Sequence, residues 1–266
     1  MIPALRRIWG LVYRHICLYR RSWPRLLELG YWPTLELLIW GFTAEFVARP
    51  QQNSGIALGA ALIGGVLLWE LALRVQMGVT ISFLEEIWSR NLGHIFVSPL
   101  RPGELVMALL VVSAMRALVG LTPAVALAAF LYDFNLFSLG MALLLLIAAL
   151  FLMGWWMALG VVALLFRYGA SAEALAWTLA FGVTPIACVF YPVRILPAWL
   201  QPIALALPAA HIFSGMRGLL LEHHTRWAEI AASFGLNAVW TVLAIMVFAA
   251  QFRAARRNGS LISIGE

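Results

Sequence analysis

The chain has 266 residues, of which 63% are hydrophobic and 11% are charged. An average soluble domain holds roughly 45–50% apolar and about 25% charged residues, and a chain of this length cannot bury so much apolar surface in its own core. A soluble globular fold is therefore excluded, and the composition indicates a protein surrounded by lipid. The 18 basic residues are all arginines scattered between apolar runs. Because they form no polar patch, nucleic acid is excluded as a partner.

The first 28 residues predict an amphipathic helix. Apolar residues recur there at steps of three and four, and arginines lie mostly between them. This pattern is typical of a helix in the membrane interface, with its rings at the acyl boundary and its guanidinium groups among phosphates. A helix packed on a soluble partner has the same pattern, and both arrangements are compatible. The apolar positions are Leu5, Ile8, Trp9, Val12, Ile16 and Tyr19, and the arginines are Arg6, Arg7, Arg14, Arg20, Arg21 and Arg25.

Six apolar stretches follow, each near the roughly 20 residues that a helix needs to cross a bilayer. We therefore predict an all-α polytopic membrane domain over residues 29–257 with six transmembrane helices, followed by a tail at 258–266. With both termini on one side, twelve arginines fall on that side and four on the other. An excess of arginine marks the cytoplasmic side, so both termini are expected in the cytoplasm. The stretches run approximately over 29–47, 56–79, 105–132, 139–166, 172–190 and 228–252.

Two connections are too long to be simple turns. The first, at 80–104, is expected in the cytoplasm and contains a short amphipathic helix over about 83–97, ended by Pro99 and Pro102. The second, at 191–227, is expected on the external side. It is too apolar for a solvated loop, yet its four prolines prevent one continuous helix. Re-entrant, broken helices that dip into the bilayer and return explain both properties.

Two segments carry a family resemblance. They are RNLGHIFVSPLRPGEL at 90–105 and FYPVRILPAWLQPIALALPAAHIFSGMRG at 190–218. Together they resemble the type-2 ATP-binding-cassette exporter permeases, a family that exports polysaccharides, lipid-linked glycans, teichoic acids and amphipathic drugs. Ala209 departs from many relatives, which have a polar residue after this proline, and the cargo therefore stays open. The matching positions are Ser98, Pro99, Leu100, Phe190, Tyr191, Pro192, Leu196, Pro197, Trp199, Pro208, Arg217 and Gly218.

The resemblance implies that the chain is half of a transmembrane dimer, with a second copy of itself as the expected mate, driven by two separate ATPase subunits. Those partners would bind ATP and Mg²⁺, whereas this chain would bind no cofactor and carry no catalytic residue. The sequence agrees, because no G-x-x-x-x-G-K-[ST] motif is present to cradle ATP phosphates. The chain is expected in a bacterial inner membrane, in contact with its lipids.

The resemblance makes the helix at 83–97 the expected coupling helix, which fits a cleft on each ATPase. Such a joint needs apolar anchors and complementary charge. A helix that touches only headgroups is the alternative, although anionic lipid would repel the two adjacent glutamates. The expected coupling residues are Glu85, Glu86, Ile87, Trp88, Arg90, Asn91, His94 and Phe96.

Aromatic side chains in the first, second and fifth spans are expected to line the cargo route, which these spans surround in relatives. Aromatic faces stack on sugar rings and also accommodate acyl chains, while Trp at headgroup depth is the alternative interpretation. A glutamate four residues before Arg74 predicts a helical ion pair facing the bundle interior or a wet cavity. The expected route residues are Trp40, Phe42, Phe46, Trp69, Glu70, Trp177, Phe181 and Phe190, and the expected external lid residues are Tyr191, Pro192, Pro197, Trp199, Pro208 and Arg217.

The expected cargo is a lipid, a lipid-linked glycan or another amphipathic compound, with a small hydrophobic drug-like compound as the alternative. An intramembrane enzyme and a scaffold that transports nothing are competing classes. His211 and Ser214, three residues apart, are the one candidate nucleophile pair for an enzyme. The run Glu222-His223-His224 predicts no metal site, because adjacent residues on a helix point apart. Arg116, within the third span, is expected to pair with one of Glu36, Glu45 and Glu173.

Overall fold

A computed structural model describes residues 3–48 and 52–258, and the described residues form helices and turns without a strand. Residues 259–266 of the predicted tail lie outside the described part. The helices are α1 (Pro3–Arg20), α2 (Trp23–Ala48), α3 (Gln52–Trp88), α4 (Leu92–Val97), α5 (Pro102–Tyr132), α6 (Met141–Tyr168), α7 (Glu173–Val183), α8 (Gln201–Leu205), α9 (Pro208–Glu222) and α10 (Trp227–Arg257), with short 3-10 turns η1 (Leu136–Leu139), η2 (Gly169–Ala172) and η3 (Val193–Ile195).

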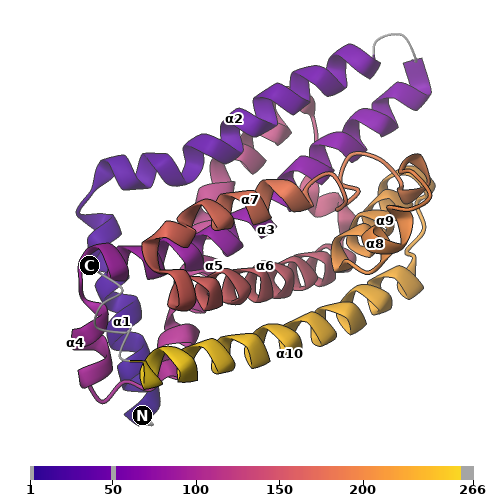
Figure 1. Ribbon diagram of the computed structural model, residues 1–266. Coiled ribbons are helices and arrows are strands. Elements are labelled where there is room, and N and C mark those ends of the chain that lie inside the picture. Colours follow the sequence, from indigo (N-terminus) through magenta and orange to yellow (C-terminus); the bar gives the residue numbers. More distant parts are fainter. Residues whose placement is uncertain (1–2, 49–51, 259–266) are drawn as a thin grey trace.

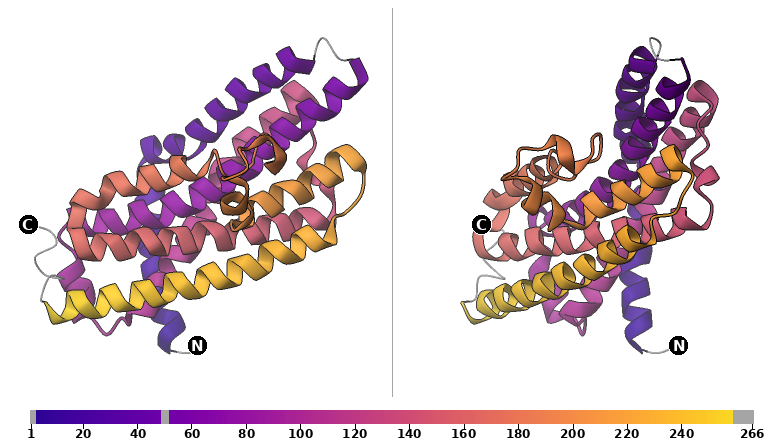
Figure 2. Two further views of the ribbon diagram at one scale, coloured as in Figure 1. Left: turned by 45° about the vertical axis from the view of Figure 1, so that its right-hand side comes forward. Right: turned by 90° about the vertical axis from the view of Figure 1, so that its right-hand side faces the viewer.

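The long helices run side by side and give the molecule two distinct ends (Figure 1). One end holds α1, α4 and the last turns of α10, and we name it the α1–α4 end. The other holds α8, α9, the start of α10, the end of α2 and the start of α3, and we name it the α8–α9 end. Both views in Figure 2 show α10 along the outer side of the bundle and α1 standing across the ends of the long helices.

The core is centred on α3, which packs against α2, α5, α6 and α9. In the most apolar 18-residue stretch of α3, 78% of the residues are buried, whereas in the corresponding stretch of α10 only 22% are buried. Buried leucines and methionines of α3 and α6 fill the space between these two helices. The side of α10 turned away from α6 and α9 is therefore free for lipid.

Four helices are long and apolar enough to cross a membrane, namely Leu58–Trp88, Pro102–Tyr132, Met141–Tyr168 and Trp227–Arg257. These helices indicate an integral membrane protein. They correspond to the second, third, fourth and sixth predicted stretches. The first stretch lies in α2, whose 26 residues include three glutamates. The fifth lies in α7, which has only 11 residues. Length and composition therefore do not establish the predicted count of six.

The predicted helical stretch at 172–190 was too long, since α7 ends at Val183. Pro185 lacks a backbone N–H and disfavours a helical residue before it. Three residues further on, Cys188 has a φ of 55°, in the left-handed region, and turns the chain again. The apolar residues after Val183 therefore form turns rather than the second half of a spanning helix.

The predicted N-terminal helix over 1–28 also ends early, at Arg20, and residues 23–28 form the first turns of α2. Pro24 explains the boundary, because proline fits the first turn of a helix but not its interior. The apolar face of α1 lies partly on the chain itself, where Val12 packs against Ala108 and Val112 of α5. Part of the apolar face is therefore covered by the chain itself, and the location of α1 in the membrane interface stays a prediction. Leu5, Trp9 and Tyr13 stay exposed.

Small residues let α2, α3 and α5 approach one another closely. A Cβ atom added at Gly120 of α5 would lie 2.5 Å from the backbone oxygen of Leu29 in α2. One added at Gly78 of α3 would lie 2.9 Å from the Cβ of Ser113 in α5. Close backbone contact of this kind is a usual way to pack helices in a membrane. These three helices therefore form a tight unit that supports α1.

Candidate functional site

The α3–α4 junction differs from its prediction, because the segment 83–97 is not one helix. α3 continues to Trp88, the chain turns over three residues, and α4 covers only Leu92–Val97. Arg90 has a φ of 54°, and the N–H groups of Arg90 and Asn91 donate to the backbone oxygens of Ile87 and Glu86. This is the capping pattern that follows a left-handed residue at a helix end. The break places the end of α3 inside the bundle and α4 at its tip.

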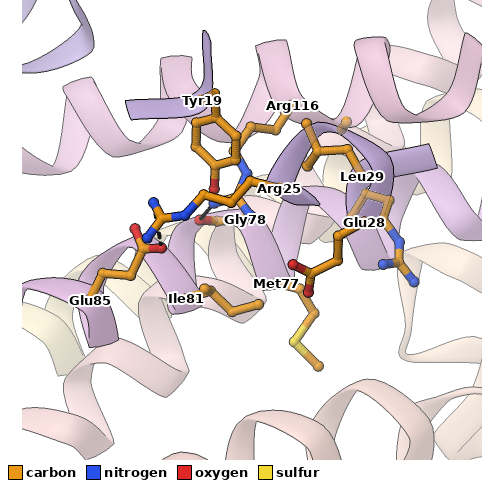
Figure 3. A pocket seen from close by; sticks show the side chains of 11 residues that line it. Tyr19, Arg25, Glu28, Leu29, Met77, Gly78, Ile81, Glu85 and Arg116 are labelled. Carbon is orange, nitrogen blue, oxygen red and sulfur yellow. Dashed lines mark hydrogen bonds and ion pairs between the residues drawn. The ribbon is translucent and has the colours of Figure 1, made fainter. Parts of the chain in front are cut away.

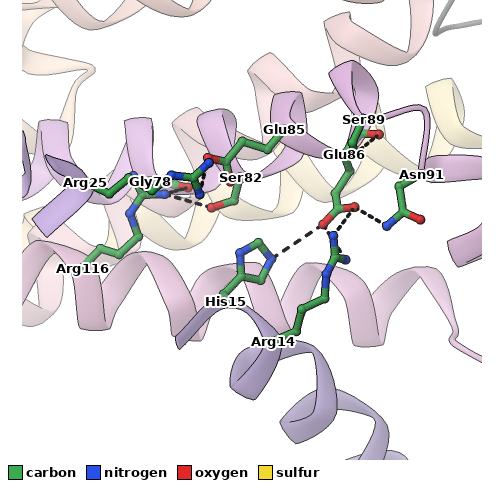
Figure 4. A network of polar contacts seen from close by, with 10 residues as sticks. All are labelled: Arg14, His15, Arg25, Gly78, Ser82, Glu85, Glu86, Ser89, Asn91 and Arg116. Atoms are coloured by element: carbon green, nitrogen blue, oxygen red, sulfur yellow. Dashed lines mark hydrogen bonds and ion pairs between the residues drawn. The ribbon is translucent and has the colours of Figure 1, made fainter. Parts of the chain in front are cut away.

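Glu86 is the centre of a polar clamp between α1 and α3 (Figure 4). Its side chain is almost fully buried, at 2% exposed, and Arg14 of α1 reaches both of its oxygens, at 2.8 and 3.2 Å. Asn91 donates to the same carboxylate at 2.7 Å. A buried carboxylate is stable only when it is paired and hydrogen-bonded. The clamp of Arg14, Glu86 and Asn91 therefore ties α1, the end of α3 and the turn before α4 together.

Arg7 forms a second cross-helix pair beside this clamp. Its Nε donates to Glu104, in the first turn of α5, at 2.8 Å, and its Nη2 atom contacts the other carboxylate oxygen. Glu104 also accepts from the backbone N–H of Arg101. Two-pronged pairs between arginine and carboxylate fix orientation as well as position. α1 is thus attached by two arginines to two different helices.

A small pocket of about 90 Å³ lies next to the clamp, where α1, α2, α3 and α5 meet (Figure 3). Arg25 of α2 pairs with Glu85 at 3.4 Å. Arg116 of α5 donates to the Ser82 hydroxyl at 3.0 Å and lies over the ring of Tyr19, 4.7 Å from its centre. It also donates to the backbone oxygen of Gly78, so its contacts lie on α3 and α1. The pairing predicted for it with Glu36, Glu45 or Glu173 was therefore wrong.

His15 of α1 is buried. Neither of its ring nitrogens has a hydrogen bond among the residues that the structure describes. Its Nε2 atom lies 3.9 Å from Glu86. Burial lowers the pKa of His15 to about 4; Glu86 opposes this shift, while Arg14, Arg116 and Arg25 add to it. The ring is therefore neutral at pH 7 and sits beside a charge network without joining it.

The expected coupling residues divide into an inward and an outward set. Ile87 is 2% exposed and packs in the core of the bundle, and Glu86 is held inside by the clamp. A coupling surface requires side chains that face outward, and these two face inward. Trp88 is 53% exposed, and Arg90 and His94 are exposed beside it. The side chain of Phe96 lies outside the described part of the structure. Glu85 is partly buried and pairs with Arg25, and Asn91 is partly buried and donates to Glu86.

The expected route residues are likewise spread over different environments. Trp69 is 4% exposed and lies edge-on to Phe213 in the core, so it faces no open path. Glu70 is buried and accepts from Arg74 at 3.1 Å, which confirms the predicted ion pair. Trp40 of α2 stacks on Phe190, with ring centres 4.2 Å apart. The exposed aromatic residues are Phe42, Phe46, Trp177 and Phe181.

The segment 191–227 is broken into short helices at its prolines, as its composition predicted. Pro192 precedes η3 and Pro208 begins α9. Arg217 of α9 donates to the backbone oxygens of Cys188 and Val189, at 2.8 and 3.3 Å, and so fixes α9 to the turns after α7. The remaining expected lid residues lie at the surface or partly buried, with Tyr191 donating to the backbone of Pro185, and Pro197 and Trp199 exposed.

Ser214 and His211 do not form a nucleophile pair. The Ser214 hydroxyl donates to Glu229 at 3.1 Å, and the Nδ1 atom of His211 contacts the other oxygen of the same carboxylate at 2.7 Å. A serine nucleophile needs a base within hydrogen-bond reach of its own oxygen. The Ser214 hydroxyl is bonded to Glu229 and Arg226 and not to His211, so the structure does not form the predicted pair of His211 and Ser214.

Arg14, His15 and Arg25 were missed as site residues by sequence reasoning. Arg14 and Arg25 appeared only as basic positions of an interface helix, and His15 was not singled out. The available signal was complementary charge, since a run of arginines precedes the spans and an acidic pair ends α3. That signal does not specify which arginine meets which glutamate.

Comparison with known proteins agrees with this architecture. No curated protein matches the chain. The sequence profile of the ABC-2 type transporter family matches residues 6–221, so the chain belongs to this family of membrane transport permeases.

Proposed function

We propose that this chain is the membrane subunit of an ATP-driven exporter and that its α1–α4 end docks on a separate ATPase. The observation that carries the proposal is the surface at the α3–α4 break. There Trp88 and Val97, at 53% and 89% exposed, flank Arg90 and His94. Exposed tryptophan and arginine at a protein end are typical of the centre of a protein interface.

The clamp behind this surface supports a coupling role. A push on the turn at 89–91 acts on Asn91, whose amide holds Glu86, and Glu86 is held in turn by Arg14 of α1. Paired and buried groups have discrete arrangements and do not deform continuously. A displacement of α4 would therefore move the end of α3 together with α1, rather than bend the turn alone.

The arrangement of the helices supports a cytoplasmic α1–α4 end. α1, α4 and the arginine-rich end of α10 lie together there (Figure 1), and the positive-inside rule assigns such an end to the cytoplasm. Under this proposal the chain lies in a bacterial inner membrane with both termini inside. The ATP and Mg²⁺ belong to the two ATPase subunits.

The cargo route is proposed between this chain and a second copy. Phe42 and Phe46 of α2 and Trp177 and Phe181 of α7 are exposed on helices that cover only one side of the bundle. In a dimer these aromatic faces would line a path for a lipid or lipid-linked molecule moving outward. The apolar character of the whole chain supports an amphipathic cargo, with a small hydrophobic compound as the alternative.

The test is co-expression of the chain with an ABC ATPase encoded beside its gene, followed by pull-down and ATPase measurement in detergent. Trp88→Ala combined with Arg90→Gly removes the anchor and the charge, and glycine readily adopts the left-handed conformation that Arg90 holds. We expect this variant to lose the ATPase from the complex while the chain keeps its helical content.

The matched control is Trp227→Ala, which removes an equally exposed tryptophan from the α8–α9 end. It should retain the ATPase. Loss of the ATPase in both variants, or in neither, would place the docking surface elsewhere. If wild type binds no ATPase at all, the exporter proposal fails.

A further inference from the structure

A cavity with a partly polar lining lies at the α8–α9 end, outside the proposed coupling surface. Its volume is about 520 Å³, which is in the range of small-molecule sites. One part of the wall is apolar, with Leu58, Leu62 and Leu205, and another part is charged. A cavity with an apolar and a charged wall suits a molecule that has a charged group next to a hydrocarbon part.

The carboxylates in this wall are engaged with neighbouring side chains. Both oxygens of Glu222 accept from Arg226, and both oxygens of Glu229 are contacted, one by Ser214 and one by His211.

His211 connects the carboxylate of Glu229 to the end of α8. Its Nδ1 atom lies 2.7 Å from Glu229, and its Nε2 atom lies 3.0 Å from the backbone oxygen of Leu205. The two glutamates of the wall are therefore each in contact with a side chain of the wall itself, Glu229 with His211 and Glu222 with Arg226.

Two guanidinium groups remain without an ion-pair partner among the described residues. Arg217 is half-buried, and its guanidinium donates to the backbone oxygens of Cys188 and Val189. Arg194 is exposed at the rim and makes no ion pair within the described part of the chain. The wall holds three arginines and two carboxylates, so its formal charge is about one positive unit before His211 is counted. A half-buried cation that is not paired with a carboxylate is stabilised when an anion enters the cavity.

We propose that this cavity binds a phosphate group, either free or as the headgroup of an anionic lipid. Arginine forks match the oxygens of phosphate in geometry as well as charge. The apolar wall beside Arg217 would hold the glycerol or the first part of an acyl chain. The inference concerns only the cavity and stands whether or not the chain binds an ATPase.

The test uses the purified full chain in a neutral detergent. Short-chain phosphatidylglycerol, short-chain phosphatidylcholine and inorganic phosphate are titrated separately and binding is measured by calorimetry. We expect phosphatidylglycerol or inorganic phosphate to bind and the zwitterionic lipid to bind at least tenfold more weakly. Arg217→Gln should weaken binding about tenfold, and Arg217→Lys should retain most of it because the charge is kept.

Arg194→Gln guards against a folding defect at Arg217, since Arg194 is exposed and anchors no backbone. It should weaken binding severalfold while thermal stability stays unchanged. The matched control is Arg253→Gln at the other end of the molecule, where an exposed arginine donates to a backbone oxygen. It should leave binding unchanged.

The outcomes separate the two sources of phosphate. If inorganic phosphate displaces phosphatidylglycerol, the free anion is sufficient; if the lipid binds without such competition, the headgroup and its apolar part act together. Equal binding of the two lipids with no binding of phosphate would overturn the proposal. So would an equal loss of binding in Arg253→Gln and in the cavity variants.

Discussion

The two ends of the bundle hold their charges in opposite ways. At the α1–α4 end, Arg7 and Arg14 reach carboxylates 97 and 72 residues away, and the adjacent pocket measures about 90 Å³. At the α8–α9 end, Arg226 pairs with a glutamate four residues away, Arg217 binds only backbone oxygens, and the cavity measures about 520 Å³.

The two ends differ in which segments their charged pairs connect. Pairs between distant segments join three helices into a unit, so that a displacement at one helix reaches the others. Pairs at the α8–α9 end lie at most 18 residues apart and join only α9 to the start of α10, and they leave Arg194 and Arg217 without a carboxylate partner in the described part of the chain. The first arrangement suits transmission of force, and the second suits binding of an anion.

Arg14→Ala is the strongest way to break the clamp. It leaves the carboxylate of Glu86 buried with only Asn91 as a donor, and loss of one partner of a buried pair costs roughly 3–5 kcal/mol. Because Arg14 itself is 41% exposed, we expect the lower part of this range, about 3 kcal/mol. The free energy of unfolding is measured by titration with sodium dodecyl sulfate, followed by circular dichroism.

Arg6→Ala is the matched control on the same helix. Arg6 is exposed, and a surface substitution of this kind changes stability by about 0.5 kcal/mol or less. If Arg14→Ala costs no more than Arg6→Ala, then Glu86 finds water or another donor, and the clamp does not hold α1.

Acidification is expected to weaken the same end by a smaller amount. Docked α1 holds His15 with its pKa lowered to about 4 by burial, whereas a free helix has an ordinary histidine pKa near 6.5. The docked state thus binds fewer protons, and docking is fully stable above about pH 6.5 and loses stability as the pH falls toward 4. Between pH 7 and pH 5 the loss is about 2 kcal/mol.

The native cysteines give a direct measurement of this effect. Cys17 of α1 is exposed and Cys188 is buried, so a nitroxide reagent labels α1 selectively. Its electron paramagnetic resonance spectrum should show a more mobile label at pH 5 than at pH 7. His15→Leu removes the titration without removing a hydrogen bond, because neither ring nitrogen has one. An equal change in wild type and in His15→Leu would assign the effect to another group.

The sequence predicted the helical class, the apolar helices and the proline-broken segment, because these follow from composition and local chain chemistry. The Glu70–Arg74 pair was also predictable, since both residues lie on one helix at a fixed spacing. The break at Arg90 was not. A left-handed conformation is usual for glycine and uncommon for arginine, so RN at this point carries no turn signal.

The clamp could not be predicted for a different reason. The pattern of α1 showed which residues share a face, but α5 and α3 cover that face from positions far along the chain. Which of six arginines meets Glu86 depends on the crossing of three helices, and no spacing in one sequence encodes that. The unpaired state of Arg217 was hidden in the same way, because its backbone partners lie 28 and 29 residues away.

Glu222→Gln gives the smallest effect on stability and sharpens the contrast between the ends. The Glu222–Arg226 pair is exposed, at 52% and 38%, and exposed ion pairs contribute only about 0.2–1 kcal/mol. The unfolding free energy should therefore change by about 1 kcal/mol or less, in contrast with Arg14→Ala.

The same change should strengthen binding of phosphatidylglycerol about threefold, because it removes a negative charge from the cavity wall and frees the guanidinium of Arg226 for the ligand. Calorimetry on the full chain measures this change, with Glu173→Gln, far from the cavity lining, as the variant that should leave binding unaltered. Unchanged or weaker binding in Glu222→Gln would mean that the cavity does not select for negative charge. A gain in affinity without a change in stability would mean that the charges at the α8–α9 end serve anion binding, whereas those at the α1–α4 end hold helices together.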